Sequence, residues 1–319
     1  MKKWIRFELV IVLFAIAIIT CEGCKEKSDS SSPELALNSE ELKSVTVKES
    51  KKPVSEDFKK YWYAGNAEIT SYKLEQARYG EVREGTSVLI YVTEPFLPEV
   101  QVKADRSNAT NIPVLKLNAT KKYLTGIYPY SIMSSTFYPV HGNKHAIKTS
   151  LSVQEWCGHV YSQLNNRNDF EFTSHSYFEG EADQNIKLDK AILENEIWNK
   201  IRINPKDLPT GELKIIPSLE YFRTKHQDIK ALPAQASLTN ANGISSYTID
   251  YGTGVRKLTI NFTTEFPHTI ESWAEEFRSG YGANAKTLTS TGTKLKSIKT
   301  PYWRQNSNKF ISLRDSLGL

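Results

Sequence analysis

The residues best suited to chemistry lie in a central stretch from His145 to Asp183. A Trp-Cys-Gly-His motif begins at Trp156 and places Cys157 two residues before His159. A thiol beside an imidazole is the nucleophile and base pair of cysteine hydrolases and transferases. Dithiol redox chemistry needs a second cysteine three positions after the first, where Val160 stands. The motif therefore excludes dithiol redox and leaves a hydrolase or transferase site as one hypothesis.

A purely structural role is the favoured interpretation of the same pair. On a strand, Cys157 and His159 share a face and lie about 6.6–7 Å apart along the chain, so a direct hydrogen bond would require a bulge or inclined side chains. A free cysteine is more often a small buried hydrophobe, and a strand histidine is more often a satisfied polar residue. Glu179 is the third residue that the catalytic hypothesis would use.

Metal binding and cofactor binding have little support in the sequence. Three acidic residues would share one face if the strand continued, and would then suit a hard cation: Glu179, Glu181 and Asp183. Gly180 interrupts them, which favours a solvated strand end. His141 and His145 are four positions apart, and the Gly142-Asn143 pair between them predicts a loop. We expect no metal and no cofactor, because no phosphate loop, nucleotide-binding glycine pattern or serine-nucleophile elbow occurs.

The central stretch is predicted to form three antiparallel strands. Four residues alternate with polar neighbours and should share one face: Ile147, Thr149, Leu151 and Val153. Residues 156–164 and 170–178 follow, separated by a five-residue polar run, as in a hairpin.

The rest of the chain also has mostly the patterns of strands. Strands are predicted at residues 67–77, 87–92, 114–117, 123–137, 213–222, 229–238 and 287–298, with a hairpin across 247–262. Apolar residues at helical spacing predict a helix at 188–201, and a second short helix is predicted at 270–277. The expected fold is therefore mainly β: a large curved antiparallel sheet, a sandwich or a half-open barrel, with one or two helices.

Composition excludes some functional classes. The chain of 319 residues is 39% hydrophobic and 24% charged, as expected of a folded globular protein. Its net charge of +5 is scattered without a basic stripe, so nucleic-acid binding has little support. Two of the three cysteines lie near the N-terminus, which leaves Cys157 unpaired and excludes a disulfide framework.

The N-terminus has the pattern of an export signal. A basic start precedes an apolar run from Leu9 to Thr20, which is shorter than the roughly 20 residues of a membrane-spanning helix. The following cysteines resemble the lipobox of bacterial lipoproteins, in which the cysteine after the cleavage site is acylated. Cys24 is preferred because Gly23 precedes it; Cys21 is the alternative, and an uncleaved anchor is a third interpretation. We therefore expect a lipoprotein signal peptide at 1–23, a flexible tether at 24–60 and a β-rich domain at 61–319.

Three stretches resemble a group of uncharacterised envelope lipoproteins of flavobacteria and other Bacteroidota. They are residues 123–131, residues 154–159 and residues 176–179, read as YLTGIYPYS, QEWCGH and SYFE. Proteins of that group are in some cases labelled "septum formation inhibitor Maf". True Maf proteins carry a Ser-x-Ser-Pro-Arg-Arg loop, whereas the only Ser-Pro here, at Ser32, is followed by Glu34. The resemblance thus implies an envelope lipoprotein. It does not imply the nucleotide pyrophosphatase activity of true Maf proteins.

These observations lead to one main functional hypothesis. We expect a lipid-anchored outer-membrane protein, facing the periplasm or exposed at the surface, whose β domain is a non-catalytic scaffold. Its expected partners are the membrane, through the acyl anchor, and an apolar ligand or an envelope protein. The rival hypothesis is an envelope hydrolase or transferase that uses Cys157 and His159.

Overall fold

The structure, a computed structural model, describes residues 52–106, 108–142 and 144–319. The predicted signal peptide, both candidate acylation sites (Cys24 and Cys21) and most of the predicted tether lie outside the described residues. The last part of the predicted tether is described, and helix α1 (Glu56–Trp62) begins within it. The Ser55 side chain caps this helix, and Phe58 and Trp62 are buried, so ordered structure begins before residue 60.

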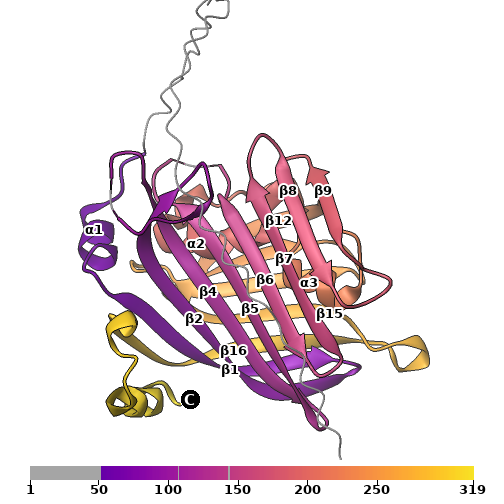
Figure 1. The fold of residues 1–319 in the computed structure, drawn as a ribbon. Coiled ribbons are helices and arrows are strands. Elements are labelled where there is room, and N and C mark those ends of the chain that lie inside the picture. Colours follow the sequence, from indigo (N-terminus) through magenta and orange to yellow (C-terminus); the bar gives the residue numbers. More distant parts are fainter. Residues whose placement is uncertain (1–51, 107, 143) are drawn as a thin grey trace, which may run out of the picture. The chain divides into compact units, whose positions relative to one another are not determined.

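Residues from α1 onward are organised around one 16-stranded sheet (Figure 1). The strands are β1 (Ala67–Arg78), β2 (Glu81–Leu97), β3 (Val102–Lys103), β4 (Ile112–Thr125), β5 (Tyr128–Pro139), β6 (Lys148–Glu155), β7 (Gly158–Asn166), β8 (Phe170–Ser176), β9 (Gln184–Leu188), β10 (Ile192–Leu193), β11 (Gly211–Ile216), β12 (Leu232–Ala241), β13 (Ile244–Asp250), β14 (Arg256–Thr263), β15 (Ile270–Ser279) and β16 (Lys286–Thr300). The other helices are α2 (Glu194–Ile203), α3 (Leu219–Lys225) and the 3-10 segments η1 (Pro205–Asp207), η2 (Gly282–Asn284), η3 (Tyr302–Arg304) and η4 (Asn308–Leu317).

The sheet is open and almost wholly antiparallel. Its order runs β10-β11-β12-β13-β14-β15-β16-β1-β2-β4-β5-β6-β7-β8-β9, with β3 paired to β2, and only β10 and β11 pair in parallel among the described strands. The prediction of a mainly β fold with a large curved antiparallel sheet is confirmed, and the sheet does not close into a barrel. No helix in residues 52–106, 108–142 and 144–319 has the length and apolar character needed to cross a membrane.

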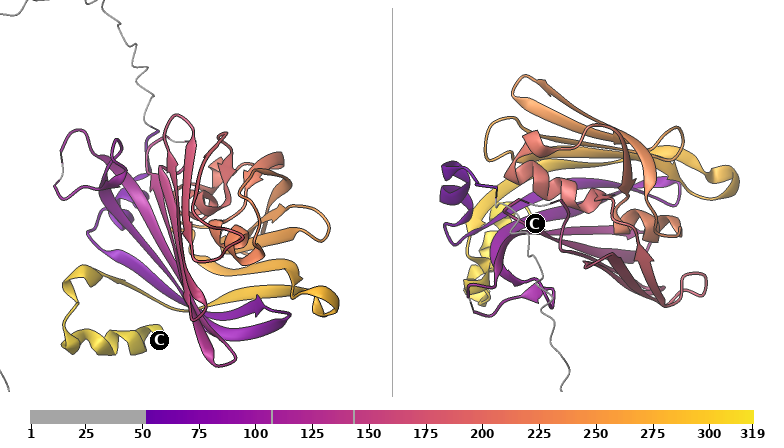
Figure 2. Two further views of the ribbon diagram at one scale, coloured as in Figure 1. Left: turned by 45° about the vertical axis from the view of Figure 1, so that its right-hand side comes forward. Right: turned by 90° about the horizontal axis from the view of Figure 1, so that it is seen from above.

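Two wings of the sheet face each other across α2 and α3. The sheet bends where β16, β1 and β2 meet, so that β4–β9 lie opposite β11–β15 (Figure 2). Both wings contact the helices: α2 packs on β4 and β5, its Trp198 meets Trp273 of β15 edge-on at 5.5 Å, and α3 packs on β6. The concave side is therefore filled mainly by helices.

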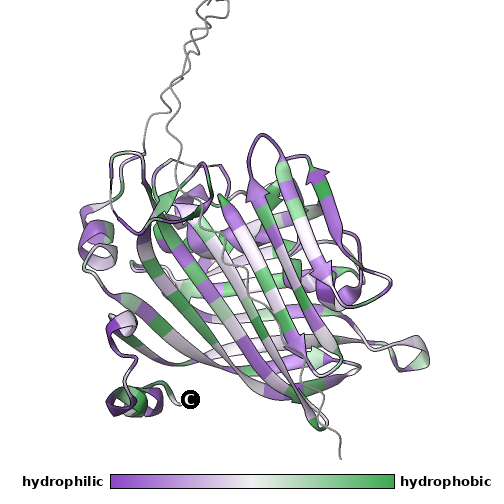
Figure 3. Ribbon diagram, in the orientation of Figure 1, coloured by the Kyte–Doolittle hydropathy of each residue, from purple (hydrophilic) through white to green (hydrophobic). Residues whose placement is uncertain are grey.

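Alternation of side chains explains the strands, as the banding in Figure 3 shows. In β6, Thr149, Leu151 and Val153 are buried while Ser152 and Gln154 are exposed, which confirms the predicted face. The inward side chains join the main hydrophobic core with Ile197 and Ile201 of α2. Each fully buried aliphatic side chain contributes about 1.5–3 kcal/mol to folding.

Three sequence predictions need correction. The helix predicted at 188–201 begins only at Glu194, after β9 and β10. The strand predicted at 213–222 ends at Ile216, and α3 begins after Ser218, whose hydroxyl accepts a hydrogen bond from the Tyr221 N–H at 3.2 Å. The short helix predicted at 270–277 is wrong, since those residues form β15 between β14 and β16. There, pairing on both sides outweighs local propensity.

Candidate functional site

The structure does not bring the predicted catalytic residues together. Cys157 lies in the turn between β6 and β7, not on a strand, and it is exposed, so the expectation of a buried cysteine is wrong. His159 lies on β7 and Glu179 in the turn after β8, both exposed. Among the described residues, no hydrogen bond or ion pair links any two of these three side chains. A hydrogen bond with Glu155 raises the pKa of the Cys157 thiol, which disfavours the nucleophilic thiolate.

We expect the Cys157 thiol to behave as an ordinary exposed thiol. In a chain whose Cys21 and Cys24 are replaced by serine, the folded protein should react with 5,5′-dithiobis(2-nitrobenzoate), at a rate that rises continuously with pH through neutrality. His159→Ala should leave this rate unchanged, and Glu155→Gln should increase it. A rate plateau near neutral pH that disappears in His159→Ala would instead restore the cysteine–histidine pair.

Of the three acidic residues considered for a cation, Glu181 and Asp183 already contact basic side chains. Strand β8 ends at Ser176, so the shared strand face does not form. Glu181 lies 2.9 Å from Arg223 and 2.5 Å from His226, while Asp183 lies 3.1 Å from His175. His145 contacts Glu196, and His141 contacts the carbonyl of Lys52, so these two histidines serve separate sites. In the described residues, no group of three or more potential metal ligands is gathered.

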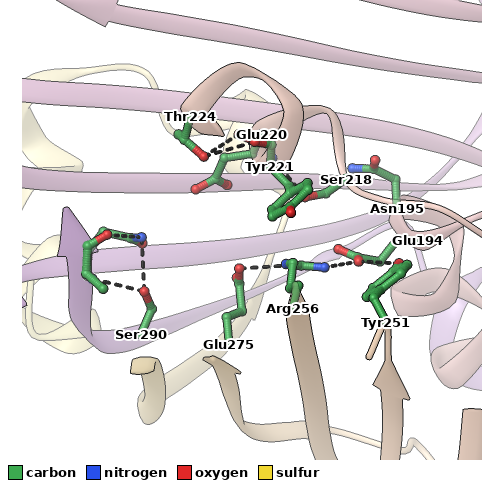
Figure 4. A network of polar contacts seen from close by, with 12 residues as sticks. Glu194, Asn195, Ser218, Glu220, Tyr221, Thr224, Tyr251, Arg256, Glu275 and Ser290 are labelled. Carbon is green, nitrogen blue, oxygen red and sulfur yellow. Dashed lines mark hydrogen bonds and ion pairs between the residues drawn. The ribbon is translucent and has the colours of Figure 1, made fainter. Parts of the chain in front are cut away.

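Between the two wings, five charged residues form a largely buried ionic network, and Figure 4 shows the part of it that joins Glu194, Arg256 and Glu275. Arg256 of β14 contacts Glu194 of α2 and, at 2.9 Å, Glu275 of β15. Lys121 of β4 lies 2.9 Å from Glu220 of α3 and 3.3 Å from Glu275. Burial raises the pKa of Glu275, but Lys121 and Arg256 outweigh it and lower that pKa to about 2. The network joins the wings through paired charges.

The hollow beside this network is too small for the apolar ligand considered above. It has a volume of about 60 Å³ and is lined in part by Trp198 and Trp273 together with Arg256 and Glu275. Ligand sites for drug-sized molecules are about 300–1,000 Å³, so this hollow suits only a few water molecules.

A larger cleft opens where β1, α3 and β15 end. Its volume is about 280 Å³. We call it the cationic cleft, and it is lined by Gln76, Ala77, Arg78, Tyr79, Tyr221, Thr224, Lys225, Gln227, Gly254, Val255, Phe277, Arg278, Ser279, Gly280 and Tyr281. These lining residues include arginine and lysine but neither aspartate nor glutamate. Four of them are aromatic, so the walls combine positive charge with flat apolar surfaces.

Arg78 is the unusual residue of this cleft. Four arginines are buried in the described chain: Arg78, Arg202, Arg223 and Arg256. Each of the last three contacts at least one carboxylate, whereas Arg78 contacts none. Its guanidinium donates instead to the Thr224 carbonyl at 2.8 Å and to the hydroxyls of Tyr130 and Tyr79 at 3.3 and 3.2 Å. Arg78 is thus a 7%-exposed cation surrounded only by neutral partners.

Lys225, at the end of α3, adds a second cation without a counterion. Its ammonium donates to the Arg278 carbonyl and lies 4.2 Å from the centre of the Phe277 ring, and it forms no ion pair among the described residues. Burial, followed by the charges of Arg78 and Arg256, lowers the pKa of Lys225 to about 8. Burial is the larger cause of this lowering, and the two neighbouring arginine charges add to it.

Two turns fix the wall of the cleft. Tyr79 and Gly80 form the two-residue turn between β1 and β2 with φ of 56° and 79°, values typical of a type I′ hairpin. The turn holds the Tyr79 ring 4.2 Å from the Arg78 guanidinium. Gly280, with φ of 93°, lies in the neighbouring turn after β15, where a Cβ would lie 2.8 Å from the Asn284 carbonyl oxygen and 3.2 Å from the Cα of Gly80. Glycine is therefore required for the close approach of these two turns.

The cleft was missed in the sequence because its residues are far apart along the chain. Arg78, Lys225 and Phe277 belong to three elements that meet only after the sheet has bent. The only local signal was the turn at Tyr79-Gly80. Comparison with known proteins adds no assignment, because no family model, curated protein or solved structure matches this chain.

Proposed function

We propose that this chain is a non-catalytic ligand-binding protein of the cell envelope, held on a membrane by acyl chains on Cys24 or, alternatively, Cys21. Its ligand is a small organic anion that binds in the cationic cleft. The single observation that carries the ligand assignment is the buried, carboxylate-free guanidinium of Arg78.

The energetic argument rests on the cost of burying charge. An ion that is transferred from water to a protein interior without a counterion loses several kcal/mol of solvation, even after relaxation. Arg202, Arg223 and Arg256 offset that cost with carboxylates of this chain. Arg78 has only neutral hydrogen-bond acceptors and Lys225 forms no ion pair among the described residues, so an incoming carboxylate, phosphate or sulfonate gains two charge-assisted partners.

The walls of the cleft indicate an organic rather than an inorganic anion. Tyr79, Tyr221, Phe277 and Tyr281 surround a volume of about 280 Å³, far more than phosphate or sulfate needs. Aromatic rings favour a flat or apolar group beside the charge. The chemistry shared by the expected ligands is one anionic group joined to a small aromatic or aliphatic body.

Isothermal titration calorimetry tests this proposal with a matched pair of probes. Benzyl phosphate should bind to the folded chain with one site, whereas benzyl alcohol, which has the same ring without the charge, should not. The affinity for benzyl phosphate should fall as salt is added, since ions screen the two cations. Equal binding of the two probes, or binding of neither, would refute the assignment.

Lys225 makes the binding of an anion dependent on pH. With a pKa of about 8 in the free protein, Lys225 is largely charged at pH 7 and largely neutral at pH 9.5. A bound anion raises that pKa, so the affinity should weaken above pH 8 by up to about tenfold per pH unit. Benzyl phosphate is already a dianion there, because the second pKa of a phosphate ester is about 6.

The matched variant for the pH dependence is Lys225→Arg, whose guanidinium stays charged throughout this range. Its affinity for benzyl phosphate should stay level between pH 7 and 9.5. If the affinity of the wild type is also constant between pH 7 and 9.5, Lys225 does not contact the anion.

The acyl anchor is tested separately from the ligand. Cells that are fed an alkyne-bearing palmitate analogue should incorporate it into the wild-type chain and into Cys21→Ala, but not into Cys24→Ala. Labelling of all three chains would contradict acylation at a single one of these cysteines. Labelling that is lost only in Cys21→Ala would place the acyl chain on Cys21.

A further inference from the structure

A second surface lies on the outer face of the wing formed by β5–β8. Opposite residues of paired strands share a face, and one rank across the four strands comprises Met133, Ser152, Tyr161 and His175. The next rank comprises Ser131, Gln154, His159 and Tyr177. Their neighbours along each strand, such as Ile132, Val153 and Val160, are buried on the opposite face. We call the two ranks the outer platform.

The outer platform is hollowed and offers few charges. The hollow over it has a volume of about 450 Å³. Asp183 is the only acidic residue in its lining, where it lies 3.1 Å from His175, and no lysine or arginine lines it. The side chains of the two ranks carry hydroxyl, amide, imidazole, thioether and phenol groups. Four strands at about 4.8 Å spacing make the platform roughly 14 Å across, which is long enough for a short oligosaccharide.

Two exposed aromatic rings of the platform are held in place. Tyr177 is 76% exposed, yet its ring rests on Gly158, where a Cβ would lie 2.6 Å from the ring. Tyr161 is 44% exposed, and its hydroxyl donates to the Gln163 side chain at 3.0 Å. Rings that are both exposed and fixed lose little entropy when a ligand covers them. In this interpretation the Trp-Cys-Gly-His motif provides Gly158, on which the Tyr177 ring packs, rather than a catalytic pair.

We propose that the outer platform binds a neutral carbohydrate chain. A sugar presents hydroxyl groups that both donate and accept hydrogen bonds, which suits amide, imidazole and hydroxyl side chains. Its C–H faces pack on aromatic rings such as those of Tyr161 and Tyr177. A neutral ligand also accounts for a platform without lysine or arginine, in a chain whose residues are 24% charged. This site is independent of the cationic cleft.

The experiment is calorimetry of the full chain with four neutral hexasaccharides: maltohexaose, cellohexaose, mannohexaose and chitohexaose. At least one should bind at millimolar concentration or below, with an affinity that is the same at low and high salt. Tyr161→Ala and Tyr177→Ala should each weaken that binding roughly three- to tenfold. Gly158→Ala should do the same, because the added Cβ displaces the Tyr177 ring.

Trp303→Ala is the matched control, because Trp303 is an exposed aromatic residue of η3 outside the platform. Its hexasaccharide affinity should equal that of the wild type. Urea denaturation of every variant separates lost binding from lost folding. Three outcomes would overturn the proposal. None of the four sugars binds, or binding survives both tyrosine substitutions. In the third, the only property that the platform variants lose is the capture of a protein from envelope extracts.

Discussion

Arg202→Met is expected to lower the free energy of unfolding by about 3–5 kcal/mol, because it leaves a buried carboxylate without its cation. Arg202 of α2 and Glu68 of β1 are each 1% exposed. Their two parallel contacts measure 2.6 and 2.7 Å, the bidentate arrangement that gives the strongest charge-assisted pairs. The guanidinium also donates to the Pro267 carbonyl at 3.0 Å. The substitution therefore removes the ion pair that joins α2 to β1 at the bend of the sheet.

The remaining contacts of Glu68 cannot replace Arg202. Tyr61 donates to one Glu68 oxygen at 2.5 Å, but a phenol supplies no positive charge. Burial raises the pKa of Glu68, but Arg202, with smaller contributions from the Tyr61 hydrogen bond and the charge of Lys299, more than offsets this and lowers it. Because the pKa of Glu68 is lowered, the Glu68–Arg202 pair stabilises the fold at pH values above the ordinary pKa of a glutamate. That contribution is lost as the pH falls through the lowered value.

Urea denaturation at neutral pH measures the effect on stability. Arg304→Met is the control, since Arg304 is exposed, and it should change stability by less than about 1 kcal/mol. The double variant Glu68→Leu/Arg202→Met removes both charges and should lose less stability than Arg202→Met alone. A loss of less than about 1 kcal/mol in Arg202→Met would contradict the importance of this pair.

Arg78→Met should weaken ligand binding without lowering the stability of the fold, in contrast to Arg202→Met. We expect the affinity for benzyl phosphate to fall at least about thirtyfold, as when one partner of a buried charge pair is truncated. Stability should stay unchanged or rise, because the substitution removes a buried cation that no carboxylate of the chain compensates. The methionine keeps the apolar stem that packs beside Tyr79.

The comparison of Arg78 with Arg202 separates a binding residue from a structural one. Calorimetry and urea denaturation of the same samples give both quantities. Lys187→Met is the control for the loss of one positive charge, since Lys187 is an exposed residue of β9 outside the cleft, and it should keep the wild-type affinity. If Arg78→Met instead destabilises the fold by several kcal/mol and binds benzyl phosphate normally, Arg78 is structural.

The sheet could be predicted from the sequence because its signal is local. Alternation in residues 147–153 and the turn at residues 252–254 specify strands and a hairpin without knowledge of distant residues. Residues 270–277 were misassigned because their strand state depends on β16. There, Gly292 leaves room for the ring of Trp273, and a Cβ would lie 2.1 Å from it. Such a pairing is invisible in the sequence of either strand alone.

The cationic cleft could not be predicted, for a related reason. Arg78 is notable only because no carboxylate reaches it, and that property depends on every element packed around it. Cys157 and His159 suggest a catalytic pair in the sequence only because they lie two residues apart. The turn after β6 separates their side chains, so sequence proximity was misleading here.

A crystal structure of the chain with 4-bromobenzyl phosphate tests the cationic cleft most directly, because the anomalous signal of bromine locates the ligand. We expect the phosphate within hydrogen-bonding distance of the Arg78 guanidinium and the Lys225 ammonium, with the bromobenzyl ring against Tyr221 or Phe277. A bromine signal only elsewhere on the protein, with the cleft filled by water, would contradict the proposed function.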